Sequence, residues 1–178
     1  IALPLILHRN AVVYEQRCRL QRLDGLATAA LSPVDRDWLV RLAQLYRVLR
    51  LGDGIGQLTL AARGKLLNRV DVVPVSLALA QAAVESGWGT SRFARQGNAL
   101  FGQWTWDESA GLVPTDREEG GAHAVRAFPQ LASSVRAYVG NLNISQHYAS
   151  FRSTRAALRR AGPPDGQWGY ILADQLGA

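Results

Sequence analysis

The chain has 178 residues, of which 48% are hydrophobic and 19% charged, so it can bury a core and is not expected to be disordered. Its formal net charge is +6, but the basic residues, nearly all of them arginine, are spread along the chain without the clustering of a sequence-specific nucleic-acid binder. The single cysteine, Cys18, excludes an internal disulfide and a cysteine-based zinc site. A solvated surface and attraction to an anionic polymer are both open as explanations of the positive charge.

The sequence contains no membrane-spanning segment, metal motif or cofactor motif. No apolar run approaches the length of a spanning helix, and the apolar start IALPLIL is too short for a complete signal sequence. Because the chain also contains no methionine, we expect a processed or trimmed chain whose targeting segment lies outside it. The histidines lack the spacing to acidic partners that a zinc site needs, so we expect neither a metal nor a cofactor.

The first part of the chain has the periodicity of helices. Residues 4–22 are typical of one helix, and residues 57–69 of a shorter one. Between them, Ser32 is a good N-cap and Pro33 a good first residue for a helix whose apolar side chains recur at helical spacing as far as Gly52. We therefore expect three helices before the central segment.

The central helix, VPVSLALAQAAVES, follows Pro74 and is apolar on nearly all sides, so we expect it in the middle of the molecule. It ends on one carboxylate, Glu85, before Gly87 stops it. The negative end of the helix dipole and partial burial would both favour the protonated acid, which is the form that glycoside hydrolysis requires. The small residues Ser86, Gly87 and Gly89 would let a bulky substrate approach. A carboxylate that merely points into solvent at a helix end is the alternative.

The pattern changes over about 104–128, where glycines and a proline punctuate a loosely alternating segment, and this predicts a small β-hairpin or loop lobe. Helices return over about 131–143 and 152–161, and Gly162-Pro163-Pro164 ends the second of them. We therefore expect one mainly α domain over residues 1–178, with a small β excursion after the central helix.

Aromatic and amide side chains gather close to Glu85 in the sequence. Sugar rings combine apolar C–H faces with a hydroxyl perimeter, so aromatic platforms beside amides suit a glycan in a cleft. Each aromatic residue alone is more often part of the core, but together with Glu85 they indicate a binding site. The substrate-binding candidates on this ground are Trp88, Asn98, Phe101, Gln103, Trp104 and Trp106.

A family resemblance rests on the same residues. The segment ALAQAAVESGWGTSRFARQGNALFGQW resembles the signature of bacterial peptidoglycan N-acetylglucosaminidases, the glucosaminidase family. The later segments SVRAYVGNLN and HYASFRSTRAALRRAG resemble its Bax-type branch, and the resemblance spans roughly residues 30–162. It implies a lysozyme-like helical domain, with an N-terminal helical arm at 1–69 and a catalytic core at 70–162.

The resemblance also assigns roles to residues. Glu85 stands at the position of the family's catalytic acid and Tyr138 at that of an active-site tyrosine, and Asn141 is a further substrate-binding candidate. Some members carry a second carboxylate in the hairpin lobe, for which Asp116 in DREEG is the closest match. The competing candidates are Glu118 and Glu119.

The implied activity is that of an endo-β-N-acetylglucosaminidase acting on peptidoglycan glycan strands in the cell envelope. Glu85 would protonate the leaving oxygen of the β-1,4 bond after N-acetylglucosamine. Either a second carboxylate then activates water with inversion, or the substrate's 2-acetamido group attacks with retention. A muramidase or lytic transglycosylase that cuts the other linkage is an alternative, and a non-catalytic cell-wall binding module is an alternative of another class.

Two features depart from the Bax-type pattern. Thr105 and Ala110 stand where members of this branch often have a cysteine pair, so we expect the lobe to lack that cross-link. The terminal GYILADQLGA stops short of the family's usual closing helix. The first departure weakens the assignment of Asp116, and neither affects Glu85.

Overall fold

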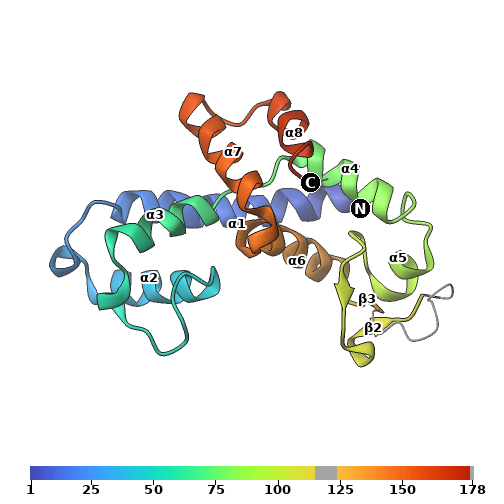
Figure 1. Ribbon diagram of the computed structural model, residues 1–178, viewed down its shortest axis with the longest axis horizontal. Coiled ribbons are helices and arrows are strands. Elements are labelled where there is room, and N and C mark those ends of the chain that lie inside the picture. Colours follow the sequence, from blue (N-terminus) through green and yellow to red (C-terminus); the bar gives the residue numbers. More distant parts are fainter. Residues whose placement is uncertain (115–123, 177–178) are drawn as a thin grey trace. The chain divides into compact units, whose positions relative to one another are not determined.

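The protein is mainly helical, as the sequence predicts, and it contains a small three-stranded antiparallel sheet (Figure 1). The computed structural model describes residues 1–114 and 124–176. The chain forms two compact units: the first comprises Ile1–Arg9 and Val73–Val139, and the second comprises Asn10–Val72 and Gly140–Ala178. The architecture is consistent with a lysozyme-like helical domain. The division into an arm at 1–69 and a core at 70–162 stays a prediction.

The secondary structure follows the predicted order. In chain order the elements are α1 (Ala2–Leu23), η1 (Thr28–Ala30), α2 (Pro33–Leu45), η2 (Ile55–Gln57), α3 (Leu60–Arg69), α4 (Val75–Glu85), α5 (Arg92–Gly97), β1 (Trp104–Thr105), η3 (Glu108–Ala110), β2 (Gly111–Leu112), β3 (Ala124–Arg126), α6 (Leu131–Ile144), η4 (Gln146–Tyr148), α7 (Ala149–Ala161) and α8 (Gly166–Ala173), where η marks a short 3-10 helix. The predicted helices are confirmed, with small shifts at their ends except for α2, which is shorter than predicted. Within residues 1–114 and 124–176, none combines the length and apolar character needed to cross a membrane.

The sequence did not predict α5 or α8, and a side-chain cap begins each of them. The Ser91 hydroxyl accepts the N–H of Ala94 at 3.1 Å in the first turn of α5. The Asp165 carboxylate accepts the N–H groups of Gln167 and Trp168 at 2.9 and 3.3 Å in the first turn of α8. Both caps are visible in the sequence, but α5 has too few residues for a helical period to be recognised.

Helix α2 ends earlier than predicted. Ser32 caps its first turn as expected, but the helix stops at Leu45 rather than near Gly52. The reason is that Arg47 adopts a left-handed conformation, with φ of 54°, which turns the chain out of the helix. The guanidinium of Arg69 donates to the carbonyl of Arg47 at 2.8 Å and to the preceding carbonyl at 2.7 Å, so the freed carbonyls have a partner.

The small sheet has the strand order β1-β3-β2, with β3 in the middle and both pairings antiparallel. Trp104 on β1 and Leu112 on β2 both lie opposite Val125. Val125 packs with Ala99 and Phe128 in a buried apolar cluster of the first unit. The lobe predicted over about 104–128 therefore contains a three-stranded sheet instead of a simple hairpin.

Arginine side chains cap the C-terminal ends of helices in the second unit. The last carbonyls of a helix have no partner within it, and a cation there also meets the negative end of the helix dipole. At the end of α1, Arg63 donates to the carbonyls of Leu23 and Leu26, and after α2, Arg69 donates to those of Tyr46 and Arg47. Two guanidinium groups serve the end of α3 and the residues that follow it: Arg17 donates to Leu67 and Val70, and Arg155 donates to Asn68, Asp71 and Val72. At the end of α6, Arg152 donates to Leu142 and Ser145. Part of the protein's positive charge is therefore internal.

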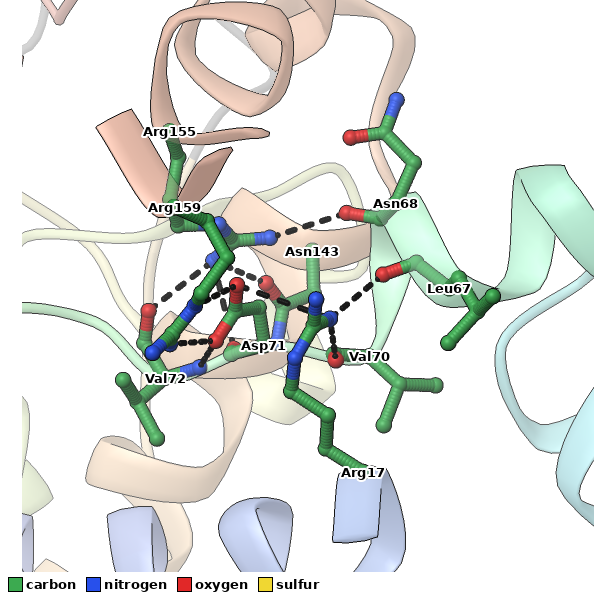
Figure 2. Close-up of polar contacts among 9 residues, drawn as sticks. All are labelled: Arg17, Leu67, Asn68, Val70, Asp71, Val72, Asn143, Arg155 and Arg159. Carbon is green, nitrogen blue, oxygen red and sulfur yellow. Dashed lines mark hydrogen bonds and ion pairs between the residues drawn. The ribbon is translucent and has the colours of Figure 1, made fainter. Parts of the chain in front are cut away.

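The buried carboxylate of Asp71 lies at the centre of a polar cluster in this unit (Figure 2). Arg159 pairs with both of its oxygens, and Arg17 lies 3.5 Å from it. Arg155, which is fully buried, donates to Oδ1 of Asn143 at 2.7 Å. Burial lowers the pKa of Arg155 to about 10, and the nearby Asp71 carboxylate opposes that shift. Arg155 is thus protonated at neutral pH, and backbone carbonyls accept the donors that one carboxylate cannot satisfy.

We predict that Arg155→Met lowers the free energy of unfolding by about 2–4 kcal/mol, because buried acceptors on Asn143 and three carbonyls lose their donor. Arg160, on the same helix and exposed, provides the matched control, and Arg160→Met should change stability by less than about 0.5 kcal/mol. Urea unfolding followed by circular dichroism measures both. Equal stability of the two variants would contradict the structural role of Arg155.

Candidate functional site

Helix α4 ends at Glu85 in a motif that satisfies its last carbonyls. Gly87 and Trp88 donate their N–H groups to the carbonyls of Val84 and Ala83, at 3.2 and 2.7 Å. These are the two hydrogen bonds of a Schellman motif, whose left-handed residue is usually glycine, and Gly87 has φ of +56°. Gly87 therefore ends the helix, as predicted.

Burial of α4 differs from the prediction. Leu77, Ala78 and Ala82 are buried, but Val84 is 77% exposed, so the helix is not buried on all sides. The side chain of Glu85 is exposed as well, and the partial burial expected for it is not observed. The carboxylate is consequently accessible to a substrate.

The turn after Glu85 explains why glycines surround Trp88. Gly87, Trp88 and Gly89 all have positive φ, at 56°, 57° and 79°. A glycine carries no Cβ and adopts this conformation at little cost. The hydroxyl of Ser86, itself buried, donates to the carbonyl of Ala82 at 2.5 Å and accepts the N–H of Gly89 at 2.8 Å, which holds the turn. The sequence interpretation gave these small residues a role in substrate access, and the structure gives them a role in the backbone of the turn.

Trp88 combines a strained backbone conformation with an exposed side chain. A non-glycine residue in the left-handed region costs about 1–2 kcal/mol, and a side chain that is 86% exposed gains little from burial in return. Strain of this kind clusters at functional sites. The exposed ring does not serve packing, and a binding role for Trp88 stays a prediction.

A loop at residues 98–103 lies directly against Glu85. A Cβ added to Gly102 would lie 2.9 Å from Oε2 of Glu85 and 3.8 Å from its Cδ, so the carboxylate packs against the bare Cα of this glycine. Gly102 has φ of +55°, a second reason for glycine at this position. Gly102 lies in the segment that resembles the glucosaminidase signature, but its contact with Glu85 was not predicted. The contact brings the loop and the end of α4 into one site.

Helix α6 holds this loop in place. The N–H of Leu100 donates to the hydroxyl of Ser134 at 3.1 Å, and Ser134 is fully buried. The ring of Phe101 stacks on that of Tyr138, with centroids 3.9 Å apart and planes 6° from parallel. Both aromatic rings are buried, so Phe101 acts here as a packing residue more than as an open platform. The sequence analysis did not identify Ser134.

The amide residues of the loop have different surroundings. Asn98 is the left-handed cap of α5, with φ of 50°, and its Nδ2 donates to the carbonyl of Phe128 at 2.9 Å. Gln103 accepts the N–H of Arg126 at its backbone carbonyl, at 2.7 Å. Its side-chain Oε1 is enclosed and has no hydrogen-bond partner among residues 1–114 and 124–176. Asn98 is thus engaged in the fold, whereas Gln103 retains an acceptor.

The indole side chains of the lobe are exposed. Trp104 on β1 is 65% exposed and Trp106 is 75% exposed. Trp104 directly follows Gln103, the last residue of the loop that contacts Glu85. Trp104 and Trp106 therefore both lie in the first unit, as Glu85 does. Large exposed aromatic side chains at a carboxylate site suit an apolar sugar face.

Four of the predicted site residues remain. Asn141 is exposed on the part of α6 that belongs to the second unit. Asp116, Glu118 and Glu119 fall outside the described residues. In the described part of the chain, no group of histidine, cysteine, aspartate and glutamate side chains is placed to hold a metal ion.

The lobe is held by hydrogen bonds where the related pattern has cysteines. The hydroxyl of Thr105 accepts the N–H of Asp107 at 3.1 Å, and the carbonyl of Ala110 accepts the N–H of Ala127 at 3.0 Å. Hydrogen bonds from the side chain and backbone of Ser109 lower the pKa of Asp107. Asp107 therefore remains ionised at neutral pH and serves the turn.

Comparisons with known proteins identify the family of the chain. The model of the glucosaminidase family, described as mannosyl-glycoprotein endo-beta-N-acetylglucosaminidase, matches residues 61–169, which include Glu85, Gly102 and Tyr138. The chain is 35% identical over 159 residues to Protein bax of Escherichia coli (strain K12); the match covers 89% of this chain and 54% of the relative, so the chain spans about half the length of that relative. No solved structure matches. On the extent of these matches, the chain belongs to the glucosaminidase family.

Proposed function

We propose that this protein is an endo-β-N-acetylglucosaminidase that hydrolyses the β-1,4 bond after N-acetylglucosamine in peptidoglycan, with Glu85 as the general acid. Family membership supports glycosidase chemistry on a glycan. The observation that carries the assignment of Glu85 is its position: an exposed carboxylate at the end of α4, packed against Gly102 and followed by the strained, exposed Trp88. The substrate is the glycan strand of the cell wall, and the site of action is the cell envelope.

The acid step uses features of the described site. Glu85 in its protonated form gives its proton to the glycosidic oxygen as the bond to the anomeric carbon breaks, so the leaving sugar departs with a hydroxyl group and Glu85 remains as a carboxylate. The exposed rings of Trp88, Trp104 and Trp106 supply apolar surface for the sugar faces. Gln103, whose Oε1 is enclosed and has no hydrogen-bond partner among residues 1–114 and 124–176, stays a substrate-binding candidate.

Two routes complete the reaction. In an inverting route, a carboxylate from Asp116, Glu118 or Glu119 activates water on the opposite face of the sugar. In a substrate-assisted route, the 2-acetamido oxygen attacks the anomeric carbon, and Tyr138 or an amide orients it. The anomeric configuration of the first product, followed by NMR during hydrolysis, separates inversion from retention.

The decisive experiment is mass spectrometry of muropeptides released from purified sacculi by the chain. Fragments with reducing-end N-acetylglucosamine support the proposal. Reducing-end N-acetylmuramic acid indicates a muramidase, and an anhydro-muramyl end indicates a lytic transglycosylase. Binding to sacculi without release of fragments indicates a non-catalytic wall-binding module.

Glu85→Gln should lower the rate of hydrolysis by at least ~10²-fold, because the amide keeps the size of the side chain but has no proton to transfer. The melting temperature should hardly change, since the side chain is exposed. Muropeptide release from sacculi measures the first effect and thermal unfolding the second. Wild-type activity in Glu85→Gln would exclude Glu85 as the acid.

Trp88→Gly should raise KM for glycan fragments, because the ring that binds the sugar is lost. The free energy of unfolding should be unchanged or up to about 1 kcal/mol higher, because relief of the left-handed strain offsets the greater entropy of glycine in the unfolded chain. Arg47→Gly is the matched control, since Arg47 is also an exposed, left-handed, non-glycine residue, with φ of 54°. Its stability should change similarly without an effect on KM. An unchanged KM in Trp88→Gly would remove Trp88 from the binding surface.

Tyr138→Phe should lower kcat strongly at an unchanged melting temperature, because only the hydroxyl is lost and the ring still stacks on Phe101. Tyr138→Leu, which removes the ring, should in addition lower stability. Initial rates and thermal unfolding of both variants are the measurements. An intact kcat with a loss of about 1 kcal/mol in Tyr138→Phe would identify Tyr138 as a core residue.

A further inference from the structure

The Glu85 carboxylate lies in close contact with Gly102. Within residues 1–114 and 124–176, the side chain of Glu85 makes no hydrogen bond or ion pair that would hold the carboxylate. The contact with Gly102 therefore limits where the carboxylate can lie. A Cβ on residue 102 would come within 2.9 Å of Oε2, closer than such atoms approach.

Gly102 itself is held on both sides. On one side, the N–H of Leu100 bonds to the buried Ser134, and Phe101 stacks on Tyr138. On the other side, the carbonyl of Gln103 accepts the N–H of Arg126 from β3. The loop is thus tied to α6 and to the sheet, so an added side chain at residue 102 must displace the flexible, exposed Glu85 side chain.

We propose that Gly102 is a positioning residue for Glu85: its missing side chain defines where the catalytic carboxylate lies, and any larger residue moves the carboxylate away from the glycosidic oxygen. The role rests on the proposed function of Glu85 as the acid. A displacement of about 1 Å can cost ~10²-fold in rate, because proton transfer depends on the geometry of donor and acceptor. The collision itself costs the fold little, since the colliding atom is the end of an exposed side chain.

The test compares two glycine-to-alanine variants with the same backbone strain. Gly102→Ala places a Cβ against Glu85, whereas Gly52→Ala, at φ of +92°, has nothing within 4 Å. Both should lose similar stability because alanine is strained in the left-handed region. Only Gly102→Ala should lower kcat, by ~10- to 100-fold, with KM within about twofold of the wild type. An unchanged kcat in Gly102→Ala, or an equal loss in Gly52→Ala, would overturn the proposal.

A second readout does not depend on hydrolysis. In protein labelled with ¹³C at the glutamate carboxyls, the signal that Glu85→Gln removes is that of Glu85. This signal should move in Gly102→Ala and stay in place in Gly52→Ala, and an unmoved signal in Gly102→Ala overturns the positioning role. If the wild-type chain releases no muropeptides while the signal still moves, the proposed hydrolysis fails and the geometric role of Gly102 stands.

Discussion

The carbonyl groups at the C-terminal ends of helices have no partner within the helix, and this protein satisfies them in two different ways. In the second unit, the ends of α1, α2, α3 and α6 receive hydrogen bonds from arginine side chains, several of them buried. In the first unit, α4 and α5 end on left-handed residues, Gly87 and Asn98, whose backbone turns the following N–H groups onto the carbonyls. A charged cap fixes a helix end from outside, whereas a left-handed cap bends the chain itself.

The left-handed ends of α4 and α5 shape the candidate site. Because α4 ends in a left-handed turn, its last residue, Glu85, is exposed and the chain reverses at once. Because the left-handed conformation continues through Trp88, an exposed indole ring follows Glu85 by three residues, and burial of that ring does not compensate for the backbone strain. The left-handed Asn98 then begins the loop whose Gly102 packs against Glu85. Backbone geometry that satisfies two helix ends therefore also brings Gly102 against Glu85, the proposed acid.

Capping of helix ends by arginine side chains changes how the positive net charge of the protein is interpreted. A pI near 10.2 and an arginine-rich composition suggest a basic surface, but Arg63, Arg69, Arg152 and Arg155 are buried and bond to carbonyls. Around Asp71, guanidinium groups outnumber carboxylates, and the backbone accepts the remaining donors. Part of the net charge thus stabilises the interior of the second unit. It contributes correspondingly less to attraction between the surface and an anionic glycan.

The sequence by itself determined the mainly α class, the order of the longer helices, the helix stop at Gly87 and the family, because these depend on local periodicity, on caps and on a contiguous motif. It did not determine the early end of α2, since that requires a left-handed arginine and a guanidinium from α3, distant in the chain. The role of Gly102 and the hydrogen bond from Leu100 to Ser134 were likewise decided by the tertiary structure. Both depend on which segments meet in space, and one sequence carries no record of such long-range contacts.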